Sequence, residues 1–185
     1  MSDPKREPPL HAADFQLDFT NPEFAVNELS GFGHIDLRGD PNDQAFLDAV
    51  RHCTGLTLPA SPNTRTGNDE MAIFWLSPDQ WLLLVAQGTE KGLEEALRSG
   101  LNSHIAVTDI SSGQTVLSLS GSLAETVIRK SCPYDVGSLS AERCTQTIFA
   151  KTQVLLWRQA ENEFQLVVRR SFADYLYQWL MDACR

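Results

Sequence analysis

The hydrophobic pattern of the chain predicts two similar α/β segments in succession. Apolar and polar residues alternate at 33–38, 104–110 and 115–119, the period of a β-strand with one buried face. The stretches 73–85 and 154–168 each contain two apolar runs around a polar break, as in a β-hairpin. Apolar residues at helical spacing follow the first strand of each segment and each hairpin. We therefore expect the element order β-α-β-β-α to occur twice.

A constant offset of 82 positions relates the two segments. Adding 82 to Trp75 gives Trp157, and adding 82 to Leu84 gives Leu166. A fixed spacing between similar segments is the signature of an internal repeat. The alternative is that any two α/β segments share such spacing by chance, and we favour the duplication.

Helix boundary signals support four helices. Asp40-Pro41 predicts the start of the first helix and Gly55 its end, while the second spans about Thr89–Ser99. Ser122 and Glu125 form a capping box for the third, and Ser171 with Asp174 an S-x-x-D cap for the fourth. The fourth helix has a wide apolar stripe: Phe172, Tyr175, Leu176, Trp179, Leu180 and Ala183.

These elements predict an α/β fold of the α+β type, a pseudo-duplication of ferredoxin-like β-α-β-β-α units with about eight strands and four helices. We expect a first unit at 31–111 and a second unit at 112–185, tightly packed on the first. Residues 1–30, rich in proline and charge, read as a flexible N-terminal arm.

The second copy departs from the first at two places. At the offset of 82, the strand pattern at 144–152 maps onto 62–70. Most of these positions belong to the loop pattern at 58–69, which contains proline, asparagine and glycine. The second copy also lacks a counterpart of the strand at 104–110. A sheet that lacks a strand has an edge or an apolar face to be covered, by the other unit or by another protein.

The composition narrows the class of protein. The net charge of −9 argues against nucleic acid and against an anionic membrane surface, since both need a basic face. The N-terminus shows no apolar signal-peptide region, and no apolar run reaches the length of a membrane span. We expect a cytoplasmic protein. The four cysteines are neither paired as C-x-x-C nor near a histidine at ligand spacing, so we read them as structural.

The usual catalytic and nucleotide-binding motifs are absent from the sequence. It has no phosphate-binding P-loop, no H-E-x-x-H and no G-x-S-x-G, and its four histidines are scattered singly. The polar run that starts at Asp109 reads as a turn held by hydroxyl–backbone bonds. We therefore expect no catalytic, cofactor-binding or metal-binding residue on this chain, and a binding or assembly role.

Several polar and aromatic residues are candidates for a partner interface. Two arginines precede the last helix, where positive charge opposes the helix dipole and a partner carboxylate would offset it. Tyrosine and tryptophan are favoured interface anchors. The candidate interface residues are Asn63, Thr64, Arg65, Trp81, Arg169, Arg170 and Tyr177.

Five segments of the chain are similar to those of a known protein family. The segments are Leu58–Arg65 (LPASPNTR), Trp75–Leu84 (WLSPDQWLLL), Asp109–Leu117 (DISSGQTVL), Gly121–Asp135 (GSLAETVIRKSCPYD) and Arg169–Leu180 (RRSFADYLYQWL). Together they resemble the gamma subunit of heterotetrameric sarcosine oxidase, and the resemblance covers about residues 30–185. The tryptophan hairpin and the S-F-A-D-Y helix are the most specific parts. The wider relatives are the folate-binding aminomethyltransferases of glycine cleavage.

The resemblance implies a structural subunit of a flavin-dependent oxidoreductase complex that demethylates sarcosine to glycine. The one-carbon unit passes to tetrahydrofolate and the electrons pass to oxygen. FAD, FMN, NAD and tetrahydrofolate are then expected on the alpha and beta subunits and zinc on delta, with no cofactor on this chain. The expected partners are the alpha, beta and delta subunits. The family assigns the gamma subunit no functional residue that can be transferred here.

Two alternatives stay open at this point. A free-standing folate-binding module of the aminomethyltransferase type would need a carboxylate for the pterin and basic groups for the glutamate tail. Asp109, Arg65 and Arg169 could serve, although no motif places them together and the chain has about half the length of such a transferase. An unrelated scaffold with the same fold is the other, because a fold does not fix a function.

Overall fold

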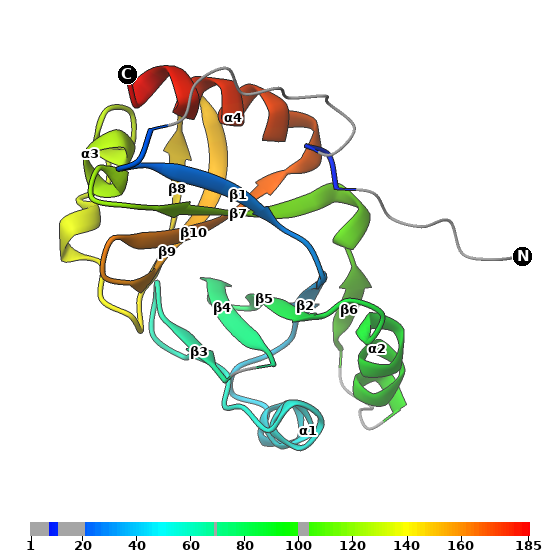
Figure 1. Cartoon of the computed structure of the whole chain (residues 1–185). Helices are drawn as coiled ribbons and strands as arrows, with labels where there is room; N and C mark the ends of the chain where they lie inside the picture. Colours follow the sequence, from blue (N-terminus) through cyan, green and yellow to red (C-terminus); the bar gives the residue numbers. More distant parts are fainter. Residues whose placement is uncertain (1–7, 11–20, 69, 100–103) are drawn as a thin grey trace, which may run out of the picture. The chain divides into compact units, whose positions relative to one another are not determined.

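The computed structural model describes residues 8–10, 21–68, 70–99 and 104–185, which form ten strands and four α-helices (Figure 1). The predicted α/β class and the four helices are confirmed, with two strands more than the eight expected. The chain divides into two compact units. The N-half unit contains 31–111 and 142–145, and the C-half unit contains 112–141, 146–185 and the described part of 1–30.

The N-half unit is one antiparallel sheet of five strands with two helices. The strand order is β3-β4-β5-β2-β6. The strand β3 forms inside the stretch that was predicted to be a loop. The elements are β2 (Phe32–Arg38), α1 (Gln44–Thr54), β3 (Arg65–Gly67), β4 (Ala72–Ser77), β5 (Gln80–Ala86), α2 (Glu90–Ser99) and β6 (Ala106–Asp109).

Helix α1 begins three residues later than predicted. Its N-cap is Asp43, whose carboxylate accepts hydrogen bonds from the backbone amides of Ala45 and Phe46. Asp40 instead accepts from the amide of Asn42 at 2.8 Å, which forms the turn before the helix. The predicted end at Gly55 is confirmed, since this residue takes the left-handed conformation with φ of 69°.

The C-half unit repeats this architecture. Its strand order is β1-β7-β10-β9-β8, with antiparallel pairing of β1 and β10 to β7 and of β9 to β10. Cys144 and Thr145, the first two residues of β8, belong to the N-half unit. The elements are β1 (Ala25–Leu29), β7 (Gln114–Ser120), α3 (Ala124–Arg129), β8 (Cys144–Phe149), β9 (Thr152–Ala160), β10 (Glu163–Arg169) and α4 (Arg170–Ala183).

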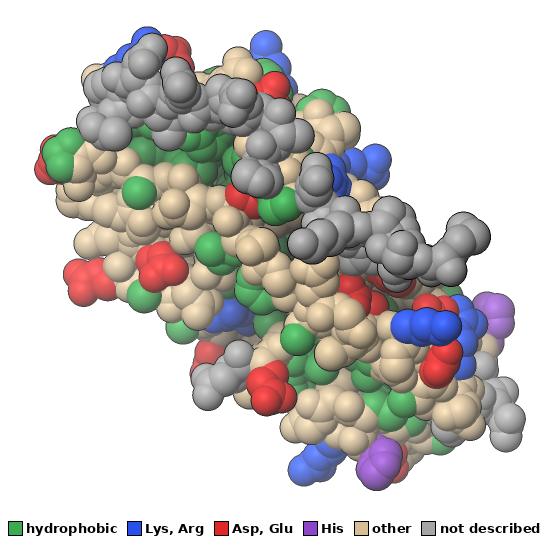
Figure 2. All heavy atoms as spheres, turned by 45° about the vertical axis from the view of Figure 1, so that its right-hand side comes forward, with side chains coloured by type: hydrophobic (Ala, Val, Ile, Leu, Met, Phe, Trp, Pro, Cys, Tyr) green, Lys and Arg blue, Asp and Glu red, His purple; other side chains and the backbone are tan. Residues whose placement is uncertain are grey.

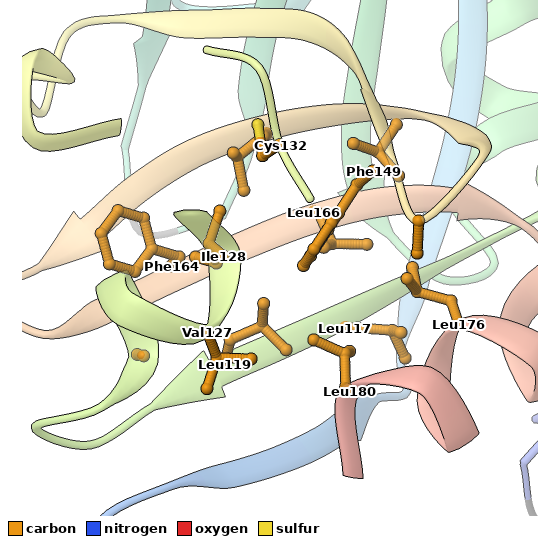
Figure 3. Close-up of a cluster of buried hydrophobic side chains, with 14 of the residues drawn as sticks. Leu117, Leu119, Val127, Ile128, Cys132, Phe149, Phe164, Leu166, Leu176 and Leu180 are labelled. Carbon is orange, nitrogen blue, oxygen red and sulfur yellow. The ribbon is translucent and has the colours of Figure 1, made fainter. Parts of the chain in front are cut away.

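Each unit has its own hydrophobic core. In the C-half unit, α3 and α4 cover one face of the sheet, and their side chains meet those of the strands (Figure 3). Leu117 and Leu166 from the sheet face Leu176 and Leu180 of α4, all fully buried. In the N-half unit the corresponding core joins strand residues such as Leu83 to Phe46 of α1 and to residues of α2. The burial of these apolar faces supplies the main stabilising free energy of both units.

The first strand of the chain occupies the place of the strand that the second copy lacks. In the N-half sheet, β6 pairs with β2 so that Asp109 lies opposite Ile35. In the C-half sheet, β1 pairs with β7 so that Glu28 lies opposite Leu117, the repeat equivalent of Ile35. The arm expected at 1–30 thus contains an edge strand; residues 1–7 and 11–20 lie outside the described residues.

Further bonds attach this N-terminal segment to the C-half unit. The carboxylate of Glu28 accepts from the Thr115 hydroxyl and, at 3.0 Å, from the Leu10 amide. The carbonyl of Glu23 accepts from the Leu123 amide at 3.1 Å. The expected packing of one unit on the other stays a prediction.

The repeat offset changes by one residue inside the chain. Ile35 pairs with Leu83 in one sheet and Leu117 pairs with Leu166 in the other, so the offset is 82 for the first strand and 83 for the hairpin. Trp75 therefore corresponds to Arg158 rather than to Trp157. A shift of one residue moves a side chain to the other face of a sheet, so the gap-free alignment assigned the second hairpin to the wrong face.

Candidate interaction surface

Helix α4 exposes two large aromatic side chains one turn apart. Phe172 is 44% exposed and Tyr175 is 41% exposed, and a spacing of three residues puts both on one side of the helix. Both belong to the apolar stripe that the sequence predicted as buried. Two aromatic rings in water at this spacing form the apolar centre of a candidate surface.

The buried side of α4 differs from the predicted one. The structure buries Ala173, Leu176, Tyr177 and Leu180, with Tyr177 only 6% exposed. Tyr177 was expected as a surface anchor, and this expectation was wrong because the helix turns that position inward. Burial raises the pKa of its phenol, with the Cys184 thiol as a smaller cause. The small side chain of Ala173 sits at the inward position of the first turn, where the predicted stripe had Phe172.

The start of α4 carries positive charge beside the two aromatic rings. Arg169 is the N-cap residue, is exposed and makes no capping hydrogen bond with its side chain. No acidic residue lies in the first turn. The predicted cap by Ser171 and Asp174 was wrong, since Asp174 accepts from the Gln178 side chain at 2.9 Å instead.

Arg169, Arg170, Phe172 and Tyr175 together make up what we call the α4 surface. Arg170 is half-buried. An apolar centre with guanidinium groups at one end suits a partner patch of apolar side chains with a carboxylate at its edge.

The second group of predicted residues lies at the edge of the N-half sheet. The carbonyl of Asn63 accepts from the Cys144 amide at 3.0 Å, and the amide of Arg65 donates to the Glu142 carbonyl at 2.9 Å. The Thr64 hydroxyl donates to a loop carbonyl. Their side chains are half-buried. The segment that leads into β8 thus pairs with the start of this edge.

Trp81 is excluded from any interface by its position. It is 1% exposed, packs against the Phe46 ring with a centroid distance of 5.8 Å, and donates its indole N–H to the Pro59 carbonyl at 2.9 Å. The prediction was wrong because a tryptophan in a hairpin can fill the core as well as anchor a partner.

Buried polar groups of the described residues hold the fold together. In the N-half unit, the Ser111 hydroxyl lies among the carboxylates of Glu90 and Asp109, and accepts from the His34 amide at 2.8 Å. Ser111 also donates its own amide to Asp109, as expected for a turn. These bonds connect the ends of β2, β6 and α2, so the cluster has a structural explanation.

The cysteines and the metal-ligating side chains are the remaining groups with possible chemistry in the part of the chain that the structure describes. Cys132, Cys144 and Cys184 are buried, and burial raises the pKa of Cys144 to about 12. The described residues contain no group of three or more metal-ligating side chains and no helix that could span a membrane. Acidic and basic side chains are interspersed on the face shown in Figure 2.

Comparisons with known proteins identify the family of the chain. Residues 38–185 match the model of the sarcosine oxidase gamma subunit family. Sarcosine oxidase subunit gamma of Corynebacterium sp. strain U-96 is 32% identical over 186 residues, covering 97% of this chain and 89% of that subunit. The same subunit of strain P-1 is 31% identical over 183 residues, with the same coverage.

Solved structures give the same relationship. A chain of the heterotetrameric sarcosine oxidase from Corynebacterium sp. U-96, solved in complex with pyrrole 2-carboxylate, is similar with a TM-score of 0.84 and 31% identity over 97% of this chain and 94% of that chain. The glycine-cleavage aminomethyltransferase T from Bartonella henselae shares the fold, with a TM-score of 0.61 and 14% identity over 86% of this chain and 45% of that chain. The chain belongs to the sarcosine oxidase gamma subunit family.

Proposed function

We propose that this chain is the structural gamma subunit of a flavin-dependent heterotetrameric sarcosine oxidase. The observation that carries the proposal is similarity along nearly the whole chain, in sequence and in fold, to gamma subunits of that complex. The reaction of the complex is the oxidative demethylation of sarcosine to glycine, with the one-carbon unit passed to tetrahydrofolate and the electrons to oxygen.

The chain itself is proposed to contribute no catalytic residue. Support comes from the way in which its polar groups are used, since the buried Glu90 and Ser111 and the exposed Asp109 form a bonded cluster that also holds backbone amides. A thiol such as that of Cys144, whose pKa is raised to about 12, is a poor nucleophile at neutral pH. FAD, FMN, NAD, tetrahydrofolate and zinc then belong to the alpha, beta and delta subunits, and the complex is cytoplasmic.

The α4 surface is the proposed contact with a larger subunit. Its exposed rings supply apolar area, and Arg169 and Arg170 meet a partner carboxylate. The side chains of Asn63, Thr64 and Arg65 form a second, smaller proposed contact. Binding of a carboxylate at the start of α4 would also offset the unfavourable charge at the positive end of the helix dipole.

The alternative of a free-standing folate-binding module is not favoured. The relatives that match along nearly the whole chain at 31–32% identity are gamma subunits, whereas the likeness to the aminomethyltransferase at 14% identity shows only the fold. No observation brings Arg65, Asp109 and Arg169 together as a pterin site.

The test is affinity purification of this chain, at its native level, from its source cells. We expect larger chains in fixed ratio and flavin absorption bands that bleach on addition of sarcosine. A colourless chain that elutes alone and binds tetrahydrofolate on titration would contradict the subunit proposal. It would favour the free-standing folate-binding module instead.

A non-catalytic role makes a separate prediction for the purified complex. Substitutions on the α4 surface should lower the amount of complex while leaving the turnover rate per bound flavin unchanged. The matched control is Glu161→Gln, an exposed substitution in the β9–β10 turn that should change neither quantity. A fall in turnover rate in fully assembled complex would contradict the non-catalytic role.

A further inference from the structure

The N-half unit has a surface hollow of about 320 Å³ next to helix α2. The hollow is lined by Thr89 just before α2, by Gly92, Leu93 and Ala96 of α2, and by Cys53 of α1 and Met71. Carbon and sulfur atoms dominate this lining, so the hollow suits an apolar group. None of these residues belongs to the surfaces discussed above.

The internal repeat shows that α2 carries smaller side chains at the hollow than α4 carries at the equivalent positions. Leu93 and Leu97 are the buried leucines of α2, and Leu176 and Leu180 are those of α4. Matching these two pairs aligns the helices at an offset of 83. At this offset Thr89, Gly92 and Ala96 correspond to Phe172, Tyr175 and Trp179. One helix thus presents three aromatic rings where the other presents a hydroxyl, a hydrogen and a methyl group.

The glycine in this wall is unfavourable for the helix itself. Gly92 lies inside α2, where glycine is less stabilising than alanine. A Cβ atom at this position would meet no atom within 4 Å, and the backbone has ordinary helical geometry. The fold therefore gives no reason for glycine here, and the absence of a side chain leaves this part of the hollow unfilled.

The rim of the hollow carries a negative charge. Glu70 is exposed and lines the hollow, so an occupant with a positive charge beside its apolar part is complementary to it. The walls are open to solvent at Ala86, Gly92 and Ala96. Small-molecule sites bury most of their ligand, whereas an open hollow needs an occupant that is held from outside.

We propose that this hollow receives an aromatic side chain of another subunit of the oxidase, next to a lysine or arginine that pairs with Glu70. The inference rests on the proposed function, because it takes the partner from that complex. Insertion of one aromatic anchor into a pocket, with a charged pair at its rim, is a common arrangement of interface hot spots.

Cys53 provides a direct probe of occupancy. It is the half-buried cysteine of the chain, and the other three are buried. Brief treatment of the folded free chain with N-ethylmaleimide at pH 8.5 should therefore add one label, at Cys53, as read by peptide mass spectrometry. In the purified complex we expect labelling of Cys53 to slow at least tenfold. Equal rates in the free chain and in the complex would overturn the proposal.

Variants that fill the hollow give an independent test. Gly92→Tyr places the ring of the α4 equivalent on α2, and we expect at least tenfold weaker binding to the other subunits by titration. Gly92→Ala leaves most of the hollow open and should bind as the unsubstituted chain does. Ala96→Leu fills the same space from the next turn and keeps the test valid if Gly92→Tyr fails to fold.

The charge at the hollow is tested by Glu70→Gln. This substitution should weaken binding to the other subunits and reduce the dependence of binding on salt, and Glu161→Gln is the matched control.

Normal assembly of the filled variants would overturn this proposal and leave the subunit role intact. Failure of the unsubstituted chain to assemble would contradict the subunit role itself, so the two failures are distinguishable.

Discussion

Asn21 donates a hydrogen bond from its side-chain amide to the backbone carbonyl of Cys184, with a distance of 2.9 Å between the two atoms. The bond joins the segment just before β1 to the end of α4, although the two residues are 163 positions apart in the chain. The strand β1, which completes the C-half sheet, therefore begins beside the end of α4. In the N-half unit the equivalent helix α2 comes directly before the equivalent strand β6.

A circular permutant follows from this proximity. We expect a chain that runs from residue 31 to Arg185 and continues through a short glycine-serine linker into residues 21–30 to fold with a melting temperature close to that of the natural order. The reason is that the linker only replaces a gap that the Asn21–Cys184 bond already bridges. Thermal unfolding followed by circular dichroism is the measurement.

The control for the permutant is the same chain without residues 21–30. It lacks β1 and the bonds of Glu23 and Glu28, so β7 loses its edge partner and the C-half unit should fail to fold cooperatively. A truncated chain that melts like the permutant would show that β1 adds nothing to the stability of the sheet.

Gly121→Ala should destabilise the C-half unit by at least about 2 kcal/mol. Gly121 has φ of 113°, and an added Cβ atom would clash with the carbonyl oxygen of Glu23. The matched control is Gly92→Ala, which should raise the free energy of unfolding by about 0.5–1 kcal/mol because a helix favours alanine. Urea unfolding monitored by tryptophan fluorescence measures both, and equal effects of the two substitutions would contradict the argument.

Arg158 should be far more important for stability than its neighbour Arg129. The Arg158 guanidinium donates to the carbonyls of Leu139 and Val136 at 3.0 and 3.1 Å and to the Glu125 carboxylate at 3.0 Å. Arg158→Met leaves these acceptors without their donor and should cost about 2–3 kcal/mol.

Arg129→Met is the control for this pair. Its side chain is 54% exposed and its ion pair with Glu125 is open to solvent, so the loss should stay below about 1 kcal/mol. Chemical denaturation of both variants gives the comparison. Similar losses would mean that the hydrogen bonds of Arg158 to the backbone contribute little.

The stability of the chain should fall above about pH 9, in part through Cys144. Burial raises the pKa of this thiol from 9.0 to about 12. Between these values the unfolded thiol releases its proton and the folded one keeps it, so the unfolded state is favoured as pH rises. One such group lowers the free energy of unfolding by about 1.4 kcal/mol for each pH unit in this range.

Cys144→Ala should flatten this decline. The informative quantity is the change in slope of the free energy of unfolding between pH 9 and 10.5, since the cavity left by the thiol lowers stability equally at every pH. An unchanged slope would show that Cys144 does not titrate in the way that its burial implies.

Substitution of the α4 surface should separate assembly from folding. Phe172→Ser and Tyr175→Ser remove exposed rings, so they should change the melting temperature by little and weaken binding to the other subunits at least tenfold. Leu176→Ser, on the buried side, should unfold the C-half unit. Unimpaired assembly of the double variant would exclude this face as a contact.

The sequence predicted most of the fold because each element carries a strong local signal. The hairpins, the glycine that ends α1 and the four helices follow from spacing and turn residues alone. The strand β1 could not be predicted in this way, because its partner β7 lies about 85 residues further along the chain and its own apolar residues, such as Val26, have no clear period.

The candidate site was predicted less well, for a geometrical reason. Tyr177 and Tyr175 differ by two positions, and a helix rotates by about 100° per residue. The composition of α4 is compatible with either side facing the core, and the small residue Ala173 was the one available sign of the inward side. Trp81 had equally good propensity for a core and for an interface, so only its burial decides between them.

The position of β1 has a consequence for synthesis on the ribosome. β1 emerges first, yet its partner β7 begins about 85 residues later, which takes about 4–17 s at ordinary elongation rates. During that interval the strand is a nascent segment without its sheet, while most of the N-half unit can already form. The C-half unit completes only after α4 has been made, so an open β-edge stays exposed to chaperones until then.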